Sequence, residues 1–405
     1  MAAKTSPGLK RSDGMPNILV LDANQRSALA VIRSLGRRGM RVVAGDHGTA
    51  PLGGASRYAS ATVQYASPAE HPARFVAEIA TLVRRFEIGT VVPATDLTTM
   101  LLVSQPEVIR PARLACASAE SYEALTDKRA LLELAARVTV AAPATRVASN
   151  WDEILDAAGV FGYPLVLKPA RSRYLRGDRV IATSVRIVNN VAELDAARGA
   201  LPWLEDMPCL AQEFIRGHGA GIFALWAADG PLAWFGHKRL REKPPSGGVS
   251  VLSESVDVDV TMQSMATRLL SAAGWVGVAM IEFRVSDTGR PYLMEVNGRF
   301  WGSLQLAIDS GLDFPWLLYQ LVNGDPIAPT PAYTRGRRLR WLLGDLDNLL
   351  LQLRSPRAGV GAKLQAALGF AASSFDFSCR QEVLRWYDPR PGLRELRQWL
   401  AALRP

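Results

Sequence analysis

The chain has 405 residues, enough for two or three packed units with ample core. Hydrophobic residues make up 48% of it and charged residues 21%, a balance typical of a soluble globular protein. No long apolar stretch follows the basic residues 1–15, so neither a signal peptide nor a membrane span is expected. The 3 cysteines lie far apart, which excludes a paired metal knuckle or redox couple and favours the cytoplasm.

The net charge of +9 is concentrated near the C-terminus. Residues 335–405 contain 13 Lys or Arg and 6 Asp or Glu, a difference of +7. The run 335–341 is basic and leucines follow it, which predicts a basic helical extension at 326–405 that packs on the body. Peripheral membrane contact of this tail is the alternative. No nucleic-acid partner is expected, and an oligomer is left open.

Strands and helices alternate in the first quarter of the chain, after residues 1–15, which are expected to be disordered. This alternation predicts a Rossmann-like α/β unit at 16–118, with a parallel sheet covered on both faces. The first turn lacks the Gly-x-Gly-x-x-Gly pattern, which disfavours a dehydrogenase. The expected elements are strands at 18–21, 42–44, 90–93 and near 114, and helices at 27–38 and about 69–86.

The second unit, at 119–325, mixes its elements in an order that predicts an α+β fold. An Arg-rich loop at 170–178 follows its first long strand, and a Gly-rich loop lies near 245–248. The expected helices are at 127–137, 151–160, 191–199, 260–273 and from about 304, and the expected strands at 164–169, 208–215, 220–228, 231–240, 251–258, 276–285 and 291–297.

The last two of these strands carry the clearest chemical pattern. With Thr288-Gly289 as a two-residue turn they form a hairpin in which Glu282 lies directly opposite Glu295. Side chains alternate along a strand, so Asn297 and Arg299 lie on the same face as Glu295. Two opposed carboxylates repel unless a proton, a cation or water separates them, and hard oxygen ligands suit Mg²⁺. The alternative is a solvent-facing hairpin with incidental acids.

The sequence Met-Glu-Val-Asn-Gly-Arg at 294–299, preceded by Ile-Glu-Phe at 281–283, resembles the metal-binding core of the ATP-grasp superfamily. The biotin carboxylase and carbamoyl-phosphate synthetase branch is the most similar. The resemblance covers about residues 16–325 and implies an α/β domain followed by a two-lobed nucleotide clamp.

By this resemblance, Glu282, Glu295 and Asn297 would bind Mg²⁺, with Mn²⁺ as the alternative metal and Glu295 bridging two ions. Arg299 would hold the substrate carboxylate or the developing acyl phosphate. These roles follow from the family's motif, whereas the hairpin pairing follows from the strand pattern.

The resemblance also implies an ATP site. Lys128 and Lys168 match the two lysines that such enzymes direct at the phosphates. Glu213, with the backbone of Phe214 and Ile215, matches the hinge that receives adenine. For Lys128 and Glu213 the alternative is a surface position, and Lys168 must find a partner or a cleft because it ends an apolar strand.

The strand at 231–240 ends in a basic run. Because side chains alternate along a strand, Lys238 and Leu240 share one face of the sheet, and His237, Arg239 and Arg241 share the other. Lys238 or Arg241 is expected to contact the γ-phosphate or an anionic substrate, but the sequence leaves open which face looks inward. His237 is interpreted as structural.

Two features depart from the family pattern. The Arg-rich loop 170–178 contains only Gly177 where a glycine-rich loop usually covers the phosphates, so arginine side chains or a mobile loop are the alternatives. After the hinge, Gly217-His218-Gly219 stands where an acid often meets the ribose, so ribose contacts stay unassigned.

Together these features imply an ATP-dependent ligase that activates a carboxylate as an acyl phosphate and couples it to an amine, releasing ADP and phosphate. A bicarbonate-using carboxylase and a non-catalytic nucleotide-binding protein are the alternatives. The identity of the carboxylate and the amine is not readable from the sequence.

Overall fold

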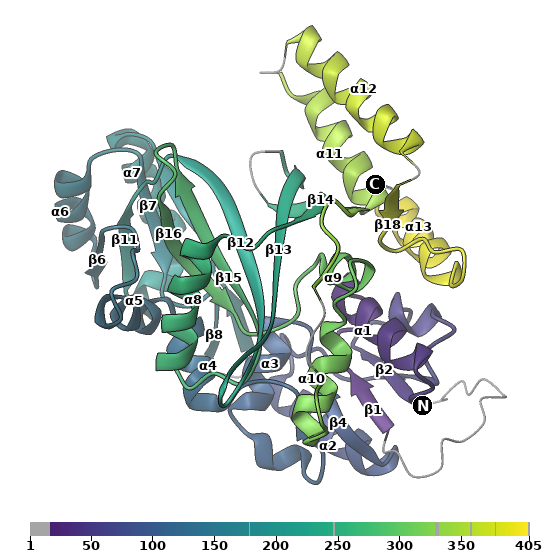
Figure 1. The fold of residues 1–405 in the computed structure, drawn as a ribbon. Coiled ribbons are helices and arrows are strands. Elements are labelled where there is room, and N and C mark those ends of the chain that lie inside the picture. The colour runs from purple at the N-terminus through teal and green to yellow at the C-terminus, as the bar shows by residue number, and fades with distance from the viewer. Residues whose placement is uncertain are drawn as a thin grey trace.

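The computed structural model describes residues 17–177, 179–245, 248–328, 332–356, 359–376 and 378–403. The N-terminal residues 1–15, expected to be disordered, lie outside these ranges. Figure 1 shows a small lobe at the left of a large curved sheet and the N-terminal unit at the lower right of this sheet.

The N-terminal unit is a parallel sheet in the order β3-β2-β1-β4-β5. Strands β1 and β2 are buried along their whole length, as expected for central strands with helices on both faces. The predicted α/β class of this unit is therefore confirmed. Its elements are β1 (Asn17–Val20), α1 (Arg26–Arg37), β2 (Val42–Asp46), η1 (Gly53–Ala55), β3 (Ala61–Gln64), α2 (Pro72–Arg85), β4 (Ile88–Val92), α3 (Asp96–Val103), η2 (Pro106–Ile109) and β5 (Arg113–Leu114).

The small lobe is an antiparallel sheet in the order β10-β7-β11-β6, with helices packed on one face and a separate hairpin, β8–β9, beside it. Its core includes Trp151, Leu165 and Trp203. The elements are β6 (Thr145–Ala148), α6 (Trp151–Phe161), β7 (Leu165–Pro169), β8 (Arg173–Arg176), β9 (Arg179–Ala182), β10 (Arg186–Val188), α7 (Val191–Ala197), η3 (Arg198–Ala200), η4 (Pro202–Glu205) and β11 (Cys209–Glu213). The two preceding helices, α4 (Ala119–Thr126) and α5 (Lys128–Arg137), pack instead in the hydrophobic cluster of the large sheet.

The large sheet has the strand order β16-β15-β12-β13-β14-β17-β18. Helix α8 packs on one face, where Met265 and Leu269 join the same hydrophobic cluster as Ile222 and Ile281. The elements are β12 (Gly217–Ala227), β13 (Gly230–Lys243), β14 (Val249–Val256), α8 (Val260–Ala272), β15 (Gly277–Ser286), β16 (Pro291–Asn297), α9 (Leu304–Asp309) and α10 (Phe314–Asn323).

The C-terminal region is joined to this sheet and to the N-terminal unit. Strand β17 pairs with β14 and β18 with β17. The buried guanidinium of Arg33, on α1, donates to Asp388 and to the carbonyl oxygens of Glu382 and Val383. The region comprises β17 (Arg338–Arg340), α11 (Leu342–Arg354), α12 (Val360–Phe375), β18 (Cys379–Gln381) and α13 (Arg390–Ala402).

In Figure 1 helices α11 and α12 rise together away from the body, while α13 returns toward the N-terminal unit. Among the described residues, none of the helices combines the length and the apolar character that crossing a bilayer requires. Where the chain divides into domains, at 118/119 and 325/326, stays a prediction.

Candidate active site

The β15–β16 hairpin brings two glutamates together. Glu282 lies directly opposite Glu295, so the predicted pairing is confirmed. The predicted two-residue turn is wrong: Ser286 and Arg290 close a three-residue loop in which Gly289 has φ +82°. A bulge between the turn and the glutamates leaves Met294 outside the pairing, and it restores the register that the shorter turn would have given.

The side chains on this face of the hairpin converge. The amide Nδ2 of Asn297 lies 3.2 Å from Oε1 of Glu295 and 3.5 Å from Oε1 of Glu282. Burial raises the pKa of Glu282, and the Glu295 carboxylate raises it further, whereas Arg239 opposes the shift. The two carboxylates therefore share one amide donor and repel each other across it.

This donor set fits a hard cation. Two carboxylates and an amide supply oxygen atoms of the kind that Mg²⁺ prefers. A half-turn of the Asn297 amide exchanges its nitrogen and oxygen, two atoms whose assignment depends on the hydrogen-bond network. It would direct Oδ1 toward a cation held between the two carboxylates, and it would give up the contact of Oδ1 with NH2 of Arg299.

Arg299 is held at the edge of the same site. Its Nε and NH2 atoms each lie 3.0 Å from a carboxylate oxygen of Asp96, at the start of α3. Its NH1 donates to the carbonyl oxygen of Phe300, and NH2 also lies 3.3 Å from Oδ1 of Asn297. The N-terminal unit thus contributes a carboxylate directly to the site.

The two predicted phosphate-binding lysines are both buried, with 7% of Lys128 and 8% of Lys168 exposed. Burial lowers the pKa of Lys168 to about 8, with Glu295 opposing the shift and Lys128 adding to it. Lys128 begins α5 and its Nζ donates to Ser172 at 2.8 Å. A buried ammonium near a second one is costly unless an anion compensates them, which suits a phosphate site.

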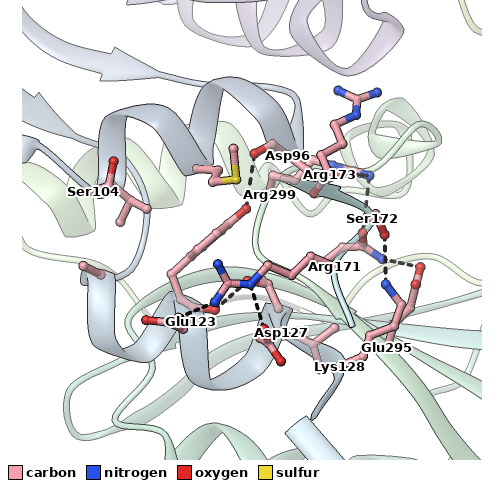
Figure 2. A pocket seen from close by; sticks show the side chains of 17 residues that line it. Asp96, Ser104, Glu123, Asp127, Lys128, Arg171, Ser172, Arg173, Glu295 and Arg299 are labelled. Carbon is pink, nitrogen blue, oxygen red and sulfur yellow. Dashed lines mark hydrogen bonds and ion pairs between the residues drawn. The ribbon is translucent and has the colours of Figure 1, made fainter. Parts of the chain in front are cut away.

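The Arg-rich segment expected to be a loop is the β8–β9 hairpin, with Gly177 at φ +63° in its turn. Asp178 lies outside the described residues. Arg171, which precedes β8, forms ion pairs with Glu123 at 2.6 Å and Asp127 at 2.7 Å. Figure 2 shows Arg171 reaching across the site toward these two helices, so side-chain ion pairs fasten the base of this hairpin.

A cavity of about 360 Å³ lies between α3, α4, the β8–β9 hairpin and the carboxylates. Acidic, basic and apolar groups all reach it, a composition suited to a small polar ligand. Its lining comprises Asp96, Met100, Val103, Ser104, Ala119, Tyr122, Glu123, Thr126, Asp127, Lys128, Arg171, Ser172, Arg173, Glu295, Val296, Asn297 and Arg299.

The expected adenine hinge lies outside this lining. Glu213 ends β11, and its Oε1 accepts from the backbone N–H of Ala144 at 2.8 Å. Phe214 packs beside Arg284, whose Nε donates to the carbonyl oxygen of Ile215 at 3.2 Å. Glu213 is the last residue of β11, which pairs with the strand of Lys168, and Phe214 and Ile215 follow it. Their role toward adenine stays a proposal.

The structure does not bring Lys238 and Arg241 to the carboxylates. Lys238 is exposed on the opposite face of β13, and the β13–β14 pairing is irregular between Arg239 and Arg241. Arg241 instead pairs with Asp345 of α11 at 2.7 Å and donates to Ser373 of α12. The expectation that one of these two side chains lines the site is therefore corrected.

Arg239 occupies the place expected for them. Its NH2 lies 3.3 Å from Oε2 of Glu282, although β12 separates the two strands. It crosses β12 at Gly219, where an added Cβ would lie 3.9 Å from NH1 of Arg239. The alternating glycines of β12 are the sequence signal that a side chain can cross this strand. Recognising which side chain crosses it requires knowing that Gly221 pairs with both His237 and Glu282.

The chain is similar in sequence to a known family and to several known proteins. A family model described as "ATP-grasp in the biosynthetic pathway with Ter operon" matches residues 236–344. An uncharacterised Sinorhizobium fredii protein is 25% identical over 68% of this chain and 57% of its own length. The carbamoyl phosphate synthase large chain of Pasteurella multocida is 28% identical over 45% of this chain. The chain spans only 17% of that protein.

Solved structures share the fold at low sequence identity. A biotin carboxylase–β,γ-ATP complex from Campylobacter jejuni has a TM-score of 0.64 at 14% identity, covering 80% of this chain and 74% of that one. The L-amino acid ligase of Bacillus licheniformis has a TM-score of 0.59 at 17% identity, covering 76% and 74%. Residues 236–344 are therefore similar to an ATP-grasp family, and the chain shares the fold of a biotin carboxylase and of an L-amino acid ligase.

Proposed function

We propose that the protein is an ATP-dependent ligase that phosphorylates a substrate carboxylate and couples the resulting acyl phosphate to an amine, releasing ADP and phosphate. The similarity to an ATP-grasp family and the shared fold support an ATP-dependent ligase in general. The specific chemistry is supported by one observation, a cluster of charges around one cavity. Lys128, Glu295 and Arg299 line this cavity, and Glu282 lies directly opposite Glu295. The charges of Glu295 and Lys128 also act on the buried Lys168.

Each residue has a distinct task in this proposal. Glu282, Glu295 and Asn297 would hold Mg²⁺, which when bound neutralises phosphate charge. Lys128 and Lys168 would bind phosphate oxygens of ATP, since an anion compensates their buried charge. Glu213 and the backbone of Phe214 and Ile215 would orient the adenine.

Phosphoryl transfer asks the protein mainly for position and charge neutralisation, so no covalent protein intermediate is needed. The substrate carboxylate attacks the γ-phosphorus of ATP, the bond to the β,γ-bridging oxygen breaks, and ADP leaves. Arg299 stabilises the charge on the acyl phosphate. The amine then attacks the acyl carbon and phosphate leaves, with one amine proton lost to solvent.

The nucleotide product tests the reaction class. With Mg-ATP and a panel of amino acids, sugar acids and small peptides, we expect substrate-dependent release of ADP and phosphate, and hydroxylamine should trap the acyl phosphate as a hydroxamate. Release of AMP and pyrophosphate would overturn the proposal. Dependence of ADP release on bicarbonate would favour the carboxylase alternative, and nucleotide binding without turnover across the panel would favour a sensor.

The cellular setting is also a proposal. Cys116, Cys209 and Cys379 are free thiols, as a reducing compartment such as the cytoplasm would keep them. The carboxylate and the amine are the expected small-molecule partners.

A further inference from the structure

Arg299 has almost no free hydrogen-bonding capacity in this structure. Its Nε and one NH2 hydrogen point at the two oxygens of Asp96, both at 3.0 Å. NH2 also reaches Asn297 Oδ1, and NH1 donates to the carbonyl oxygen of Phe300. The guanidinium edge that grips a carboxylate with two parallel bonds is therefore already occupied.

Asp96 is suited to leaving this position. Its side chain is 45% exposed, whereas that of Arg299 is 23% exposed, and both line the cavity beside Glu295. Asp96 is also the first residue of α3, where the helix N-terminus stabilises a carboxylate after its cation is lost. If Asp96 leaves Arg299, its carboxylate is therefore not left as a buried charge without compensation.

We propose that Asp96 holds the place of the substrate carboxylate on Arg299, so that the substrate binds by displacing Asp96. The proposal rests on the proposed function, because Arg299 is the residue assigned there to the carboxylate. It makes Asp96 an internal competitor of the substrate carboxylate, and this competitor comes from the N-terminal unit rather than from the β15–β16 hairpin.

Selectivity follows from the geometry of this exchange. A carboxylate that replaces Asp96 restores both parallel hydrogen bonds, whereas chloride or water restores fewer of them. Because Asp96 must leave before any anion binds, it lowers the apparent affinity for every anion by the same factor, and only an anion with a high intrinsic affinity for Arg299, such as a carboxylate, still binds. The apparent affinity falls by the fraction of molecules in which Arg299 is free.

The test uses acetate as a carboxylate probe and needs no turnover. In the full-length protein with Mg²⁺ and ADP, NMR follows the line width of ¹³C-acetate and the Nε–H signal of Arg299 at constant ionic strength. We expect Asp96→Asn and Asp96→Ala to bind acetate about twofold to fivefold more tightly than the wild type, the range that corresponds to an exposed ion pair. Arg299→Lys, which cannot form two parallel bonds, should lose the tight binding.

The matched control is Asp257→Asn, which removes the same charge from an exposed Arg–Asp pair outside the cavity lining. Its acetate affinity should equal that of the wild type. Unchanged or weaker acetate binding in both Asp96 variants would overturn the proposal and leave Asp96 as a residue that only positions Arg299. Because acetate binding is measured without catalysis, failure of the product assay with tighter acetate binding would refute the ligase and keep the displaceable site.

Discussion

Glu282 meets two charged partners by very different routes. Glu295 faces it from the neighbouring strand of one hairpin, with a three-residue loop between the strands. Arg239 reaches it from β13, across the side-chain-free surface of β12 at Gly219. The first contact is set by local chain geometry, and the second requires three strands to pair correctly. In this site the negative charges come from one hairpin, whereas the positive charge that compensates them depends on the pairing of the whole sheet.

Replacing the local partner should have the largest effect. Glu295→Gln removes one carboxylate of the opposed pair and with it charge that would compensate bound cations, so we expect turnover to fall about 10³-fold with weaker Mg-ATP binding. Steady-state kinetics and nucleotide titration measure the two effects. Asp287→Asn, in the exposed loop of the same hairpin, is the control and should retain activity. Near wild-type turnover in Glu295→Gln would remove the hairpin from the mechanism.

Lys168 sharpens the comparison because it approaches the site from the small lobe and carries a stability cost. Its pKa in the folded protein is about 8, below the ordinary value of 10.5, so the unfolded chain holds the proton more tightly between these pH values. Below pH 8 the buried charge costs stability, and this cost disappears as pH rises from 8 to 10.5.

Lys168→Met should therefore raise the free energy of unfolding at pH 7 by about 3 kcal/mol while weakening nucleotide binding. Its stability advantage should shrink as pH rises through this window, as urea unfolding at several pH values would measure. A constant difference between variant and wild type from pH 7 to 10.5 would contradict the buried charge. The exposed Lys238→Met is the control and should show neither effect.

The distant partner should matter less than the local one. Arg239→Gln leaves the Glu282 carboxylate without its cation, so we expect a 10- to 100-fold loss of turnover, roughly the range for groups that support metal ligands. Lys238→Gln, one residue away on the opposite face, should change turnover less than twofold. The reverse result would mean that β13 turns its other face to the substrate during catalysis.

The difference between these routes also explains what the sequence could predict. The parallel N-terminal sheet, the glutamate pair and the convergence of Asn297 with it follow from short-range patterns, and the structure contains all three. The error in the turn did not matter, because the bulge at Met294 compensated for it. The inward face of β13 depends on pairing with β12, and the Arg239–Arg241 irregularity depends on β14. Neither is encoded within β13 itself.

The same reasoning applies to Asp96, the first residue of α3, which follows β4 closely in the chain. Its carboxylate meets Arg299 across more than 200 positions of chain. Local patterns therefore identify the groups that a site contains, whereas their partners from other units require the assembled fold.

The glycine path across β12 offers a finer test of the distant route. Gly219→Val adds branches beyond a Cβ that already lies 3.9 Å from NH1 of Arg239, so the guanidinium must move away from Glu282. We expect turnover to fall about tenfold, in the lower part of the range for losing Arg239 itself. Gly219→Ala is the matched control: ordinary van der Waals contact accommodates its Cβ, and activity should stay within twofold. Combining Gly219→Val with Arg239→Gln should add little further loss, because both remove the same contact.

The hairpin loop should produce the smallest effect, and it tests how strongly local geometry fixes the glutamate pair. Gly289 has φ +82°, a conformation that costs an L-residue about 1 kcal/mol, although nothing lies within 4 Å of an added Cβ. Gly289→Ala should therefore lower the free energy of unfolding by about that amount, measured in urea, without changing turnover well below the melting temperature. The control is Gly159→Ala inside helix α6, where the added Cβ is also unobstructed and the higher helix propensity of alanine should stabilise the protein. If Gly289→Ala lost as much turnover as Glu295→Gln, the bulge at Met294 would be unable to hold the register once the loop is strained. The carboxylate pair would then depend on the loop alone, and strand pairing between Met280 and Asn297 would contribute little to its placement.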